Sequence, residues 1–256
     1  MDYKKIIDST NFYFGKQEDY SKYRPGYPKK LFELLTEVYN FKNKAIVELG
    51  AGTGKFSKIA SSYCNKIYYV EPNMDMINKG KEYCKDCNNI IFVNNTAENT
   101  KLHSDIADIV FAVQSFHWFD KVALKTEVKR ILKSSGYFAI VWNDWEDENN
   151  EFSKSYFKYI NDWNTKLTGR KYQHKNVDDR KKFFKDGMYD TYTFIHSKKY
   201  SLKMLIGLSK SLSYAPKEDE IYYDEFIKGI IEIFDKYQNN ANVRFDFHTE
   251  MYIGKV

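Results

Sequence analysis

The stretch that decides the fold is VELGAGTGKF, residues 47–56, in which a glutamate precedes three glycines at every second position. The apolar run KAIVELG (44–50) leads into these glycines and predicts a buried strand. The segment KFSKIASSYC (55–64) follows with apolar residues at helical spacing. A strand, a glycine-rich turn and a helix in this order form a ligand-binding unit of open α/β sheets, because glycine lets the backbone approach a ligand closely.

Apolar runs and amphipathic segments continue to alternate up to residue 144. Further strands are predicted at 66–72, 89–95, 107–115 and 137–144, and helices at 74–84 and 121–136, the last one ended by Gly136. Continuously apolar strands that alternate with helices predict a parallel sheet covered on both faces. We therefore expect an α/β fold, a Rossmann-like and mostly parallel sheet with helices on both faces.

Two regions depart from this alternation and define the expected domain organisation. Residues 1–43 are expected to form an N-terminal lid and a first helix, before a ligand-binding core at 44–144. Residues 145–215 are expected to form a helical or mixed cap insertion that contains a strand at 191–201. Residues 216–256 would then supply a C-terminal helix and a strand that complete the core sheet.

Composition bounds the class of protein. With 256 residues, 43% of them hydrophobic and 18% aromatic, the chain can bury a sizeable core and is globular. Its net charge of +5 is dispersed and forms no basic stripe that would favour nucleic acid. The N-terminus lacks the apolar region of a secretory signal, and no run approaches the roughly 18 apolar residues of a membrane span. Together with a count of only three cysteines, this predicts a cytoplasmic protein without a membrane partner.

Two of the cysteines form the sequence CKDC, in which Cys84 and Cys87 lie at the end of a predicted helix. A zinc site needs two further ligands at suitable spacing, and a redox pair of this kind lies at the beginning of a helix. The five histidines are scattered along the chain. We therefore predict no metal site.

The glycine spacing excludes two common phosphate-binding loops. A P-loop has the pattern G-x-x-x-x-G-K-[ST], but Leu49 takes the place of its first glycine and Phe56 that of its hydroxyl residue. A dinucleotide fingerprint has the pattern G-x-G-x-x-G, in which the last two glycines are farther apart than they are here. Glu48 would moreover repel a pyrophosphate, whereas it suits a cationic group such as an amine.

Side chains after the next two strands indicate the other parts of the ligand. Glu71 ends the second strand, where a carboxylate can accept hydrogen bonds from both hydroxyls of an adenosine ribose. Ala97 and Glu98 follow the third strand, where an adenine edge would lie. A ligand that has a ribose, an adenine and an amino group but no phosphate fits the description of S-adenosylmethionine.

Four motifs in order resemble those of the class I S-adenosylmethionine-dependent methyltransferases: VELGAGTGKFS, YYVEPNMDM, NNTAEN and ADIVFAVQSFHWFD. The segments DYSKYRPGYPKKLFELL, FHWFD and HTEMYIGKV are similar to the methyltransferase-11-type group, which includes the trans-aconitate methyltransferase-like proteins. The resemblance implies a seven-stranded sheet whose last strand is antiparallel. It also implies S-adenosyl-L-methionine as the cofactor and S-adenosyl-L-homocysteine as the product. The expected cofactor-binding residues are Arg24, Glu48, Gly50, Ala51, Gly52, Gly54, Glu71, Pro72, Asn73, Ala97, Glu98 and Gln114.

Three residues are candidates for the chemistry. Methyl transfer from a sulfonium depends mainly on alignment and desolvation, because the leaving group departs as a neutral thioether. His117 is a candidate general base, or alternatively packs in the pocket wall. Trp118 could attract the sulfonium by a cation–π interaction, or belong to the core. In the proline-framed turn YRPGYP, Tyr23 is the third candidate, and Arg24 would meet the cofactor carboxylate unless it pairs with a surface acid.

We predict methyl transfer to a carboxylate, hydroxyl or amine of a small molecule. RNA or protein methylation and cofactor binding without catalysis are the alternatives. Amino-methyltransferases of nucleic acids have an Asn/Asp-Pro-Pro-aromatic motif after the fourth strand, which the four isolated prolines of this chain cannot form. The protein is expected to be a monomer or a homodimer.

Overall fold

The computed structural model describes residues 22–144, 150–169 and 177–256, and these residues belong to two compact units. The first, here called the sheet unit, comprises the described residues within Gly26–Asn143, Asn176–Phe194 and Thr249–Val256. The second, the helical unit, comprises the described residues within Met1–Pro25, Asp144–Lys175 and Ile195–His248. No helix in the described part of the chain is long and apolar enough to cross a membrane.

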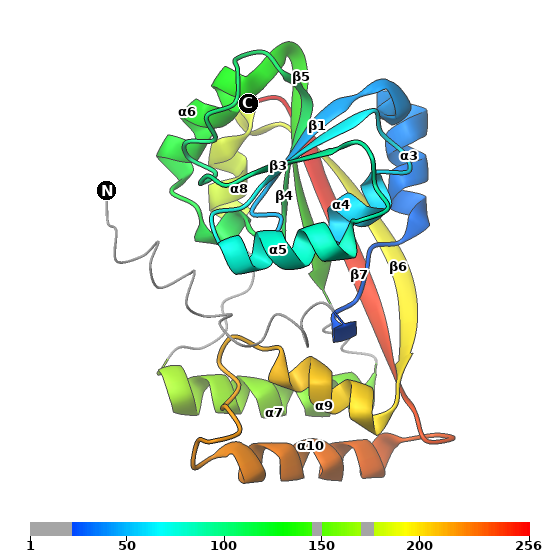
Figure 1. Ribbon diagram of the computed structural model, residues 1–256. Coiled ribbons are helices and arrows are strands. Elements are labelled where there is room, and N and C mark those ends of the chain that lie inside the picture. Colours follow the sequence, from blue (N-terminus) through cyan, green and yellow to red (C-terminus); the bar gives the residue numbers. More distant parts are fainter. Residues whose placement is uncertain (1–21, 145–149, 170–176) are drawn as a thin grey trace. The chain divides into compact units, whose positions relative to one another are not determined.

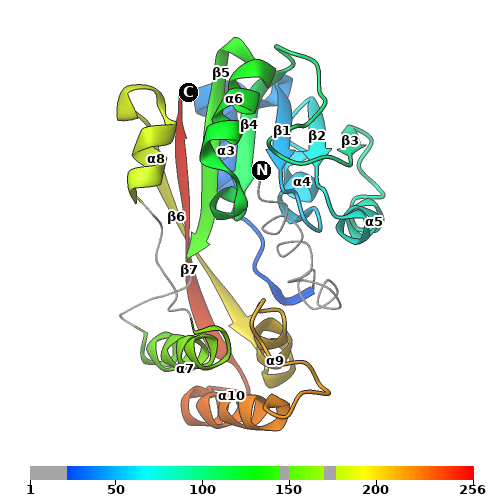
Figure 2. The same cartoon turned by 90° about the vertical axis from the view of Figure 1, so that its left-hand side faces the viewer.

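Seven strands form one mixed sheet (Figure 1). Their order is β3-β2-β1-β4-β5-β7-β6, and β1 pairs in parallel with β2 and β4, β2 with β3, and β4 with β5. In Figure 2, β7 runs opposite to β5 and β6. The predicted Rossmann-like and mostly parallel sheet is therefore confirmed. The strands are β1 (Ala45–Leu49), β2 (Lys66–Val70), β3 (Ile90–Val93), β4 (Ala107–Val113), β5 (Leu132–Asp144), β6 (Asp190–Tyr200) and β7 (Val243–Gly254).

Both faces of the sheet unit are covered, which explains why its strands are continuously apolar. Ile46 lies in a cluster with residues of α3 (Lys29–Tyr39) and α4 (Lys55–Ala60). Its neighbour Val47 lies in a cluster with residues of α6 (Lys121–Ile131) and α8 (Val177–Phe183). Successive strand residues point to opposite faces, so each face needs its own apolar side chains. Each fully buried large apolar side chain contributes roughly 1.5–3 kcal/mol.

Shorter elements connect this framework. Helix α5 (Met74–Tyr83) packs Ile77 against Tyr69 of β2. The 3-10 helices are η1 (Phe41–Asn43), η2 (Phe116–Trp118) and η3 (Lys185–Gly187). Of these, η2 follows β4 directly and carries two of the candidate catalytic residues.

The helical unit has its own aromatic core. Helix α10 (Tyr223–Tyr237) packs against α7 (Glu151–Thr168) and α9 (Leu202–Lys210). Tyr156, Phe226 and Phe245 are fully buried there. The expected boundaries at 145 and 215 differ from this division. The strand expected inside the insertion is β6 of the seven-stranded sheet, and the C-terminal helix α10 belongs to the helical unit, although β7 does complete the sheet.

The predicted end of one helix is wrong. The helix expected to reach Gly136 ends at Ile131, and β5 begins at Leu132, whose backbone is extended with φ −73° and ψ 137°. The pairing register with β4 shifts in this part of β5. A Cβ on Gly136 would lie 2.7 Å from Cδ2 of Leu132. The glycine is therefore needed for close packing in an irregular strand, and not as a helix stop.

Candidate active site

The glycine loop follows β1 and has a backbone that only glycine adopts freely. Gly50, Gly52 and Gly54 have φ of 66°, 59° and 81°. These values lie in the left-handed region, where other residues are strained. The backbone N–H groups of Gly50 and Ala51 donate to the carbonyl of Val70, at 2.9 and 3.1 Å, and so tie the loop to the end of β2.

The three glycines differ in what surrounds them. A Cβ on Gly50 would lie 2.9 Å from Cβ of Ser115, and one on Gly54 would lie 3.0 Å from Sγ of Cys84. At both positions the side chain of a larger residue would collide with neighbouring protein atoms. A Cβ on Gly52 would have no atom of the described residues within 4 Å. The open side of Gly52 is thus available to a ligand that approaches the backbone.

Glu71 is held at the end of β2 by two backbone donors. Gly52 N–H donates to Oε2 at 2.9 Å, and Asn73 N–H donates to Oε1 at 3.0 Å. Burial raises the pKa of Glu71, and these two hydrogen bonds oppose the rise. A carboxylate has about four acceptor positions, so hydrogen bonds from two ligand hydroxyls can still be accepted.

The residues after Glu71 are fixed as well. Asn73 caps α5, because its Oδ1 accepts from the backbone N–H groups of Asp75 and Met76 at 2.8 and 3.2 Å. The carbonyl of Pro72 accepts from Nδ2 of Asn94 at 2.9 Å. The predicted cofactor residues 71–73 thus form a rigid turn beside the glycine loop.

Glu48 lies beneath the glycine loop with its side chain fully buried. Its Oε2 accepts a hydrogen bond from the hydroxyl of Ser57 on α4. Burial raises the pKa of Glu48 to about 8, and the Ser57 hydrogen bond partly opposes this effect. The carboxyl group is therefore protonated at neutral pH in the absence of a cationic partner.

Thr53 is a candidate that the sequence interpretation missed. Its Oγ1 is buried, and among the described residues it has no hydrogen-bond partner. Buried hydroxyls are usually paired, so this one is suited to a ligand atom. The only sequence signal was its position between two of the motif glycines.

The loop after β3 carries Ala97 and Glu98. Ala97 is buried, and Oε1 of Glu98 accepts from the backbone N–H of Asp120 at 3.0 Å. Asp120 in turn caps α6 through hydrogen bonds from Val122 and Ala123. The loop is thereby linked to the segment that follows β4.

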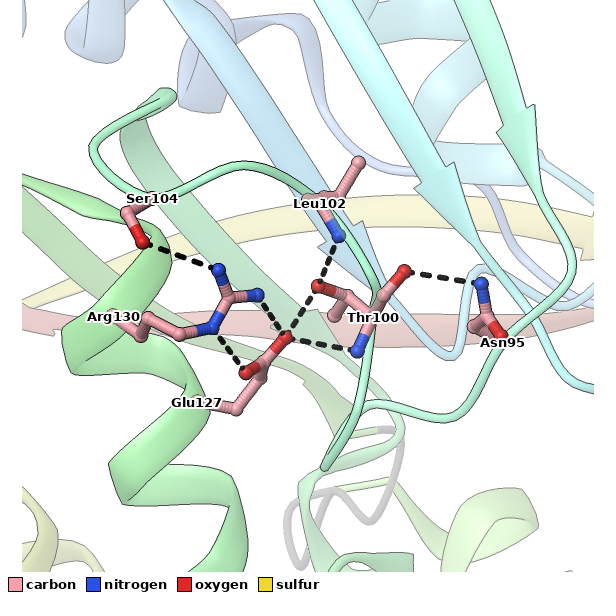
Figure 3. A network of polar contacts seen from close by, with 6 residues as sticks. All are labelled: Asn95, Thr100, Leu102, Ser104, Glu127 and Arg130. Atoms are coloured by element: carbon pink, nitrogen blue, oxygen red, sulfur yellow. Dashed lines mark hydrogen bonds and ion pairs between the residues drawn. The ribbon is translucent and has the colours of Figure 1, made fainter.

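An ion pair between the buried Glu127 and the half-buried Arg130 contacts the same loop at Thr100 (Figure 3). Glu127 of α6 accepts from the backbone N–H and the hydroxyl of Thr100, at 2.8 and 2.5 Å. Arg130 donates to both carboxylate oxygens, with Nε and Nη2 at 2.8 and 2.7 Å. Burial acts to raise the pKa of Glu127, but the hydrogen bonds from Arg130 and Thr100 lower it overall. Nη1 of Arg130 also reaches Ser104, 3.3 Å away.

Gln114 follows β4 and has a strained backbone. Its φ is 56°, in the left-handed region that non-glycine residues rarely adopt. Its N–H donates to the carbonyl of Val141 at 2.9 Å, and its Nε2 donates to the carbonyl of Asn143 at 3.2 Å. Such strain is concentrated at functional sites, but the cofactor-binding role of this backbone position stays a prediction.

His117 and Trp118 lie in η2, next to a second tryptophan. The centroid of the His117 ring is 4.6 Å from that of Trp118 and 5.2 Å from that of Trp142. Desolvation by its surroundings, and then the charge of Lys121, lowers the pKa of His117. The side chain is nonetheless exposed by surface area, which limits this shift. A neutral imidazole with an accessible nitrogen is suited to accept a proton.

Tyr23 and Arg24 lie in the helical unit. The ring of Tyr23 is buried against α9, where a Cβ on Gly207 would lie 2.2 Å from it, and its carbonyl accepts from the hydroxyl of Tyr200 at 3.0 Å. Nε of Arg24 donates to the hydroxyl of Ser211 at 2.9 Å. Their predicted roles at the cofactor stay predictions.

Three cysteines are free thiols, and Cys64 and Cys84 are buried. Burial raises the pKa of both to about 12, so neither is a reactive thiolate at neutral pH. Within the described ranges, no group of three or more His, Cys, Asp and Glu side chains could hold a metal ion.

Known proteins resemble this chain in sequence and in fold. A family model described as a methyltransferase domain matches residues 47–140. A methyltransferase-like protein of Schizosaccharomyces pombe, itself uncharacterized, is 32% identical over 131 residues, which are 50% of this chain and 50% of that protein. A probable S-adenosylmethionine-dependent methyltransferase of Saccharomyces cerevisiae is 26% identical over 147 residues, which are 55% of this chain and 50% of that protein. The chain thus spans about half the length of these curated relatives.

A solved structure supports the fold over nearly the whole chain. It is that of a protein from Anaeromyxobacter dehalogenans described as a type II methyltransferase, with a TM-score of 0.70 and 17% identity over 91% of this chain and 97% of the other. The same type of fold is indicated by the strand order, the glycine loop and the family match over 47–140. Residues 47–140 therefore match a methyltransferase domain, and the fold of the chain resembles that of a solved methyltransferase.

Proposed function

We propose that this protein binds S-adenosylmethionine at the ends of β1 and β2 and catalyses methyl transfer to a small molecule. The observation that carries the proposal is the position of the Glu71 carboxylate, which is held by the N–H groups of Gly52 and Asn73 beside the open side of Gly52. A ribose bound by Glu71 would lie against this part of the backbone. Glu48 would then face the amino group, and Ala97 and Glu98 the adenine.

The fit of these residues to the cofactor is chemical as well as steric. The site offers the two buried carboxyl groups of Glu48 and Glu71 and the hydroxyl of Thr53, which has no partner among the described residues. This set favours a ligand with hydroxyls and an amine over a nucleotide phosphate. When bound, S-adenosylmethionine supplies an electrophilic methyl group on a sulfonium.

Residues after β4 are proposed to act on the acceptor. His117 would accept a proton where the nucleophile carries one, and Trp118, with 39% of its surface exposed, would offer its ring face to positive charge. The strained backbone at Gln114 would orient the cofactor. Tyr23 is proposed as a further catalytic residue, and Arg24 as a partner of the cofactor carboxylate.

A small acceptor is favoured over RNA because the chain lacks a basic stripe and the Pro-Pro motif of nucleic-acid amino-methyltransferases. We place the protein in the cytoplasm as a monomer or homodimer, acting without a metal ion. Calorimetry with S-adenosylhomocysteine should give a Kd in the micromolar range, roughly −8 kcal/mol. Incubation of a metabolite pool with radiolabelled S-adenosylmethionine should then label a small molecule. Label in RNA or protein only would favour the first alternative, and binding without labelling would favour a non-catalytic protein.

A further inference from the structure

Arg180, in α8, is a buried cation with unpaired donors. Its side chain is 6% exposed. Among the described residues, neither Nε nor Nη1 has a hydrogen-bond acceptor, and both atoms are shielded from water. The guanidinium remains charged in proteins, and burying its donors without partners is costly. Such groups are paired in almost all folded proteins, so these two donors point to an acceptor outside the described chain.

The contact of Arg180 with Tyr252 supplies no hydrogen-bond acceptor for Nε and Nη1. The guanidinium carbon lies 3.9 Å from the centroid of the Tyr252 ring. Stacking on a ring attracts the cation but does not accept hydrogen bonds from Nε and Nη1. Burial, followed by the hydrogen bond from Tyr252 to Glu250, raises the pKa of Tyr252 to about 12, although a hydrogen bond from Arg180 and the charge of its guanidinium act against this rise. The phenol is therefore neutral and supplies no charge to balance the guanidinium.

Arg180 and His117 border the same aromatic cluster of the sheet unit. Phe183, three residues after Arg180, packs edge-on against Phe116, with 5.2 Å between ring centroids. Phe116 directly precedes His117, whose ring lies 5.2 Å from that of Trp142. Trp142 packs against the cluster that contains both phenylalanines. In Figure 2, α8 lies beside the end of β7, the strand that carries Tyr252.

We propose that Arg180 binds an oxyanion, a carboxylate or a phosphate, on the methyl acceptor. An oxyanion supplies both the missing negative charge and several acceptor oxygens. The aromatic rings nearby would contact an apolar part of the same molecule. This inference rests on the proposed function, since it names the class of acceptor for that site.

The test uses thermal melts of the full chain with sodium benzoate and inorganic phosphate as the two probes, at constant ionic strength against sodium chloride. Arg180→Gln is compared with wild type and with Arg244→Gln, an exposed arginine that pairs with Asp246 in the helical unit. Benzoate or phosphate should raise the Tm of wild type and Arg244→Gln in a saturable way. The apparent Kd should be at least tenfold higher in Arg180→Gln. Which probe binds distinguishes a carboxylate from a phosphate.

The Tm without anions provides a second readout. Removing an unpaired buried charge should leave the Tm of Arg180→Gln unchanged or higher. A markedly lower Tm, or the absence of any difference between the anions and chloride in wild type, would overturn the proposal. Calorimetry with S-adenosylhomocysteine separates the two hypotheses. If all three proteins bind S-adenosylhomocysteine normally but show no anion effect, only the proposed acceptor class is refuted. If wild type does not bind S-adenosylhomocysteine, the proposed function is refuted, and with it the assignment of the anion to a methyl acceptor.

Discussion

The carboxylate of Glu71 accepts a hydrogen bond from the backbone N–H of Gly52, with 2.9 Å between Oε2 and the nitrogen. This bond joins the turn after β2 to the glycine loop after β1. The group proposed to bind the ribose is therefore also one that holds the loop in its binding conformation. Experiments on either residue have to separate ligand contact from loop geometry.

The first prediction concerns the variant Glu71→Gln. The glutamine amide would direct its own N–H groups at the backbone N–H groups of Gly52 and Asn73 or at the ribose hydroxyls. At least one hydrogen bond to a charged acceptor is therefore lost. The Kd for S-adenosylhomocysteine should rise roughly 30- to 150-fold, corresponding to about 2–3 kcal/mol. Calorimetry measures this, and a thermal melt reports the cost to the loop. Glu82→Gln, an exposed glutamate on α5, is the matched control. Unchanged affinity in a folded Glu71→Gln protein would place the ribose elsewhere.

The second prediction uses two glycines with the same backbone. Gly52 and Gly169 have φ of 59° and 67°, and a Cβ on either would meet no atom of the described part of the chain within 4 Å. Substitution by alanine should therefore cost a similar amount of stability at both, roughly 1–2 kcal/mol. Only Gly52→Ala should weaken the binding of S-adenosylhomocysteine, because its Cβ projects toward the proposed ligand. Equal affinity of the two variants would contradict this position of the ligand.

The third prediction concerns pH and Glu48. Its folded-state pKa of about 8 lies above the ordinary value of 4.5, so the native state favours the neutral form. The resulting stability is fully present below the ordinary pKa and is lost as the pH rises through 8. Between pH 5 and pH 9, wild type should lose up to ~4 kcal/mol relative to Glu48→Gln. Denaturant unfolding at several pH values measures this difference, and parallel curves for the two proteins would contradict a buried neutral carboxyl group.

Glu48 should also link ligand binding to proton release. An ammonium group placed beside it would favour the carboxylate and lower its pKa. Binding of S-adenosylhomocysteine at pH 7 should then release a proton from wild type but not from Glu48→Gln. Calorimetry in two buffers of different ionisation enthalpy detects this release. Equal proton exchange in both proteins would place the amino group away from Glu48.

The fourth prediction concerns the network of Glu127, Thr100 and Arg130 (Figure 3). Glu127→Ala leaves the backbone N–H of Thr100 and one face of Arg130 without an acceptor. Breaking a buried ion pair from one side costs about 3–5 kcal/mol, and the partial exposure of Arg130 should reduce this to roughly 2–3 kcal/mol. Because the network holds the loop with Ala97 and Glu98, affinity for S-adenosylhomocysteine should also fall, without any contact to the ligand. A double-mutant cycle with Arg130→Ala measures the coupling, and additive effects would rule it out.

The sheet could be predicted because its signals are local. Each strand is an apolar run, and the alternation of runs and helices sets the class of sheet. The start of β5 could not, because Leu132 follows α6 without a turn residue, and its extended conformation depends on pairing with Ala107 of β4. Where a strand follows a helix directly, no turn residue marks the boundary in the sequence. The sequence also does not show that α10 belongs to the helical unit. Its apolar side chains identify a buried face, but not the element against which this face packs.

The residues predicted from motif spacing, Glu71 and the glycines, do lie together, although their roles at a cofactor stay predictions. Thr53 and the proposed anion-binding residue Arg180 could not be predicted, because their signal is a buried donor without a partner in the described part of the chain, which only coordinates reveal. Conversely, Tyr23 and Arg24 were selected for their type and their turn, but their contacts with Gly207 and Ser211 are set by packing on α9. The similarity to the trans-aconitate methyltransferase-like group stays a prediction.

The last prediction concerns His117 as a general base. Its lowered pKa keeps the imidazole neutral at pH 7, so it can accept a proton from a hydroxyl or amine acceptor. His117→Gln should lower kcat at least ~100-fold, the lower limit of general-base effects, with little change in the Kd for S-adenosylhomocysteine. His103→Gln, an exposed histidine in the loop after β3, is the control.

The pH profile adds a readout that packing alone would not affect. Because the neutral imidazole is the active form, wild-type kcat should stay level above pH 7 and fall only on the acid side of the ordinary histidine pKa of 6.5. The acceptor for this assay is the molecule labelled by radiolabelled S-adenosylmethionine in a metabolite pool. Unchanged kcat in His117→Gln, with the acid limb retained, would show that the acceptor gives no proton to His117. The ring would then be part of the pocket wall beside Trp118 and Trp142, and the reaction would depend on alignment of an acceptor that is already deprotonated.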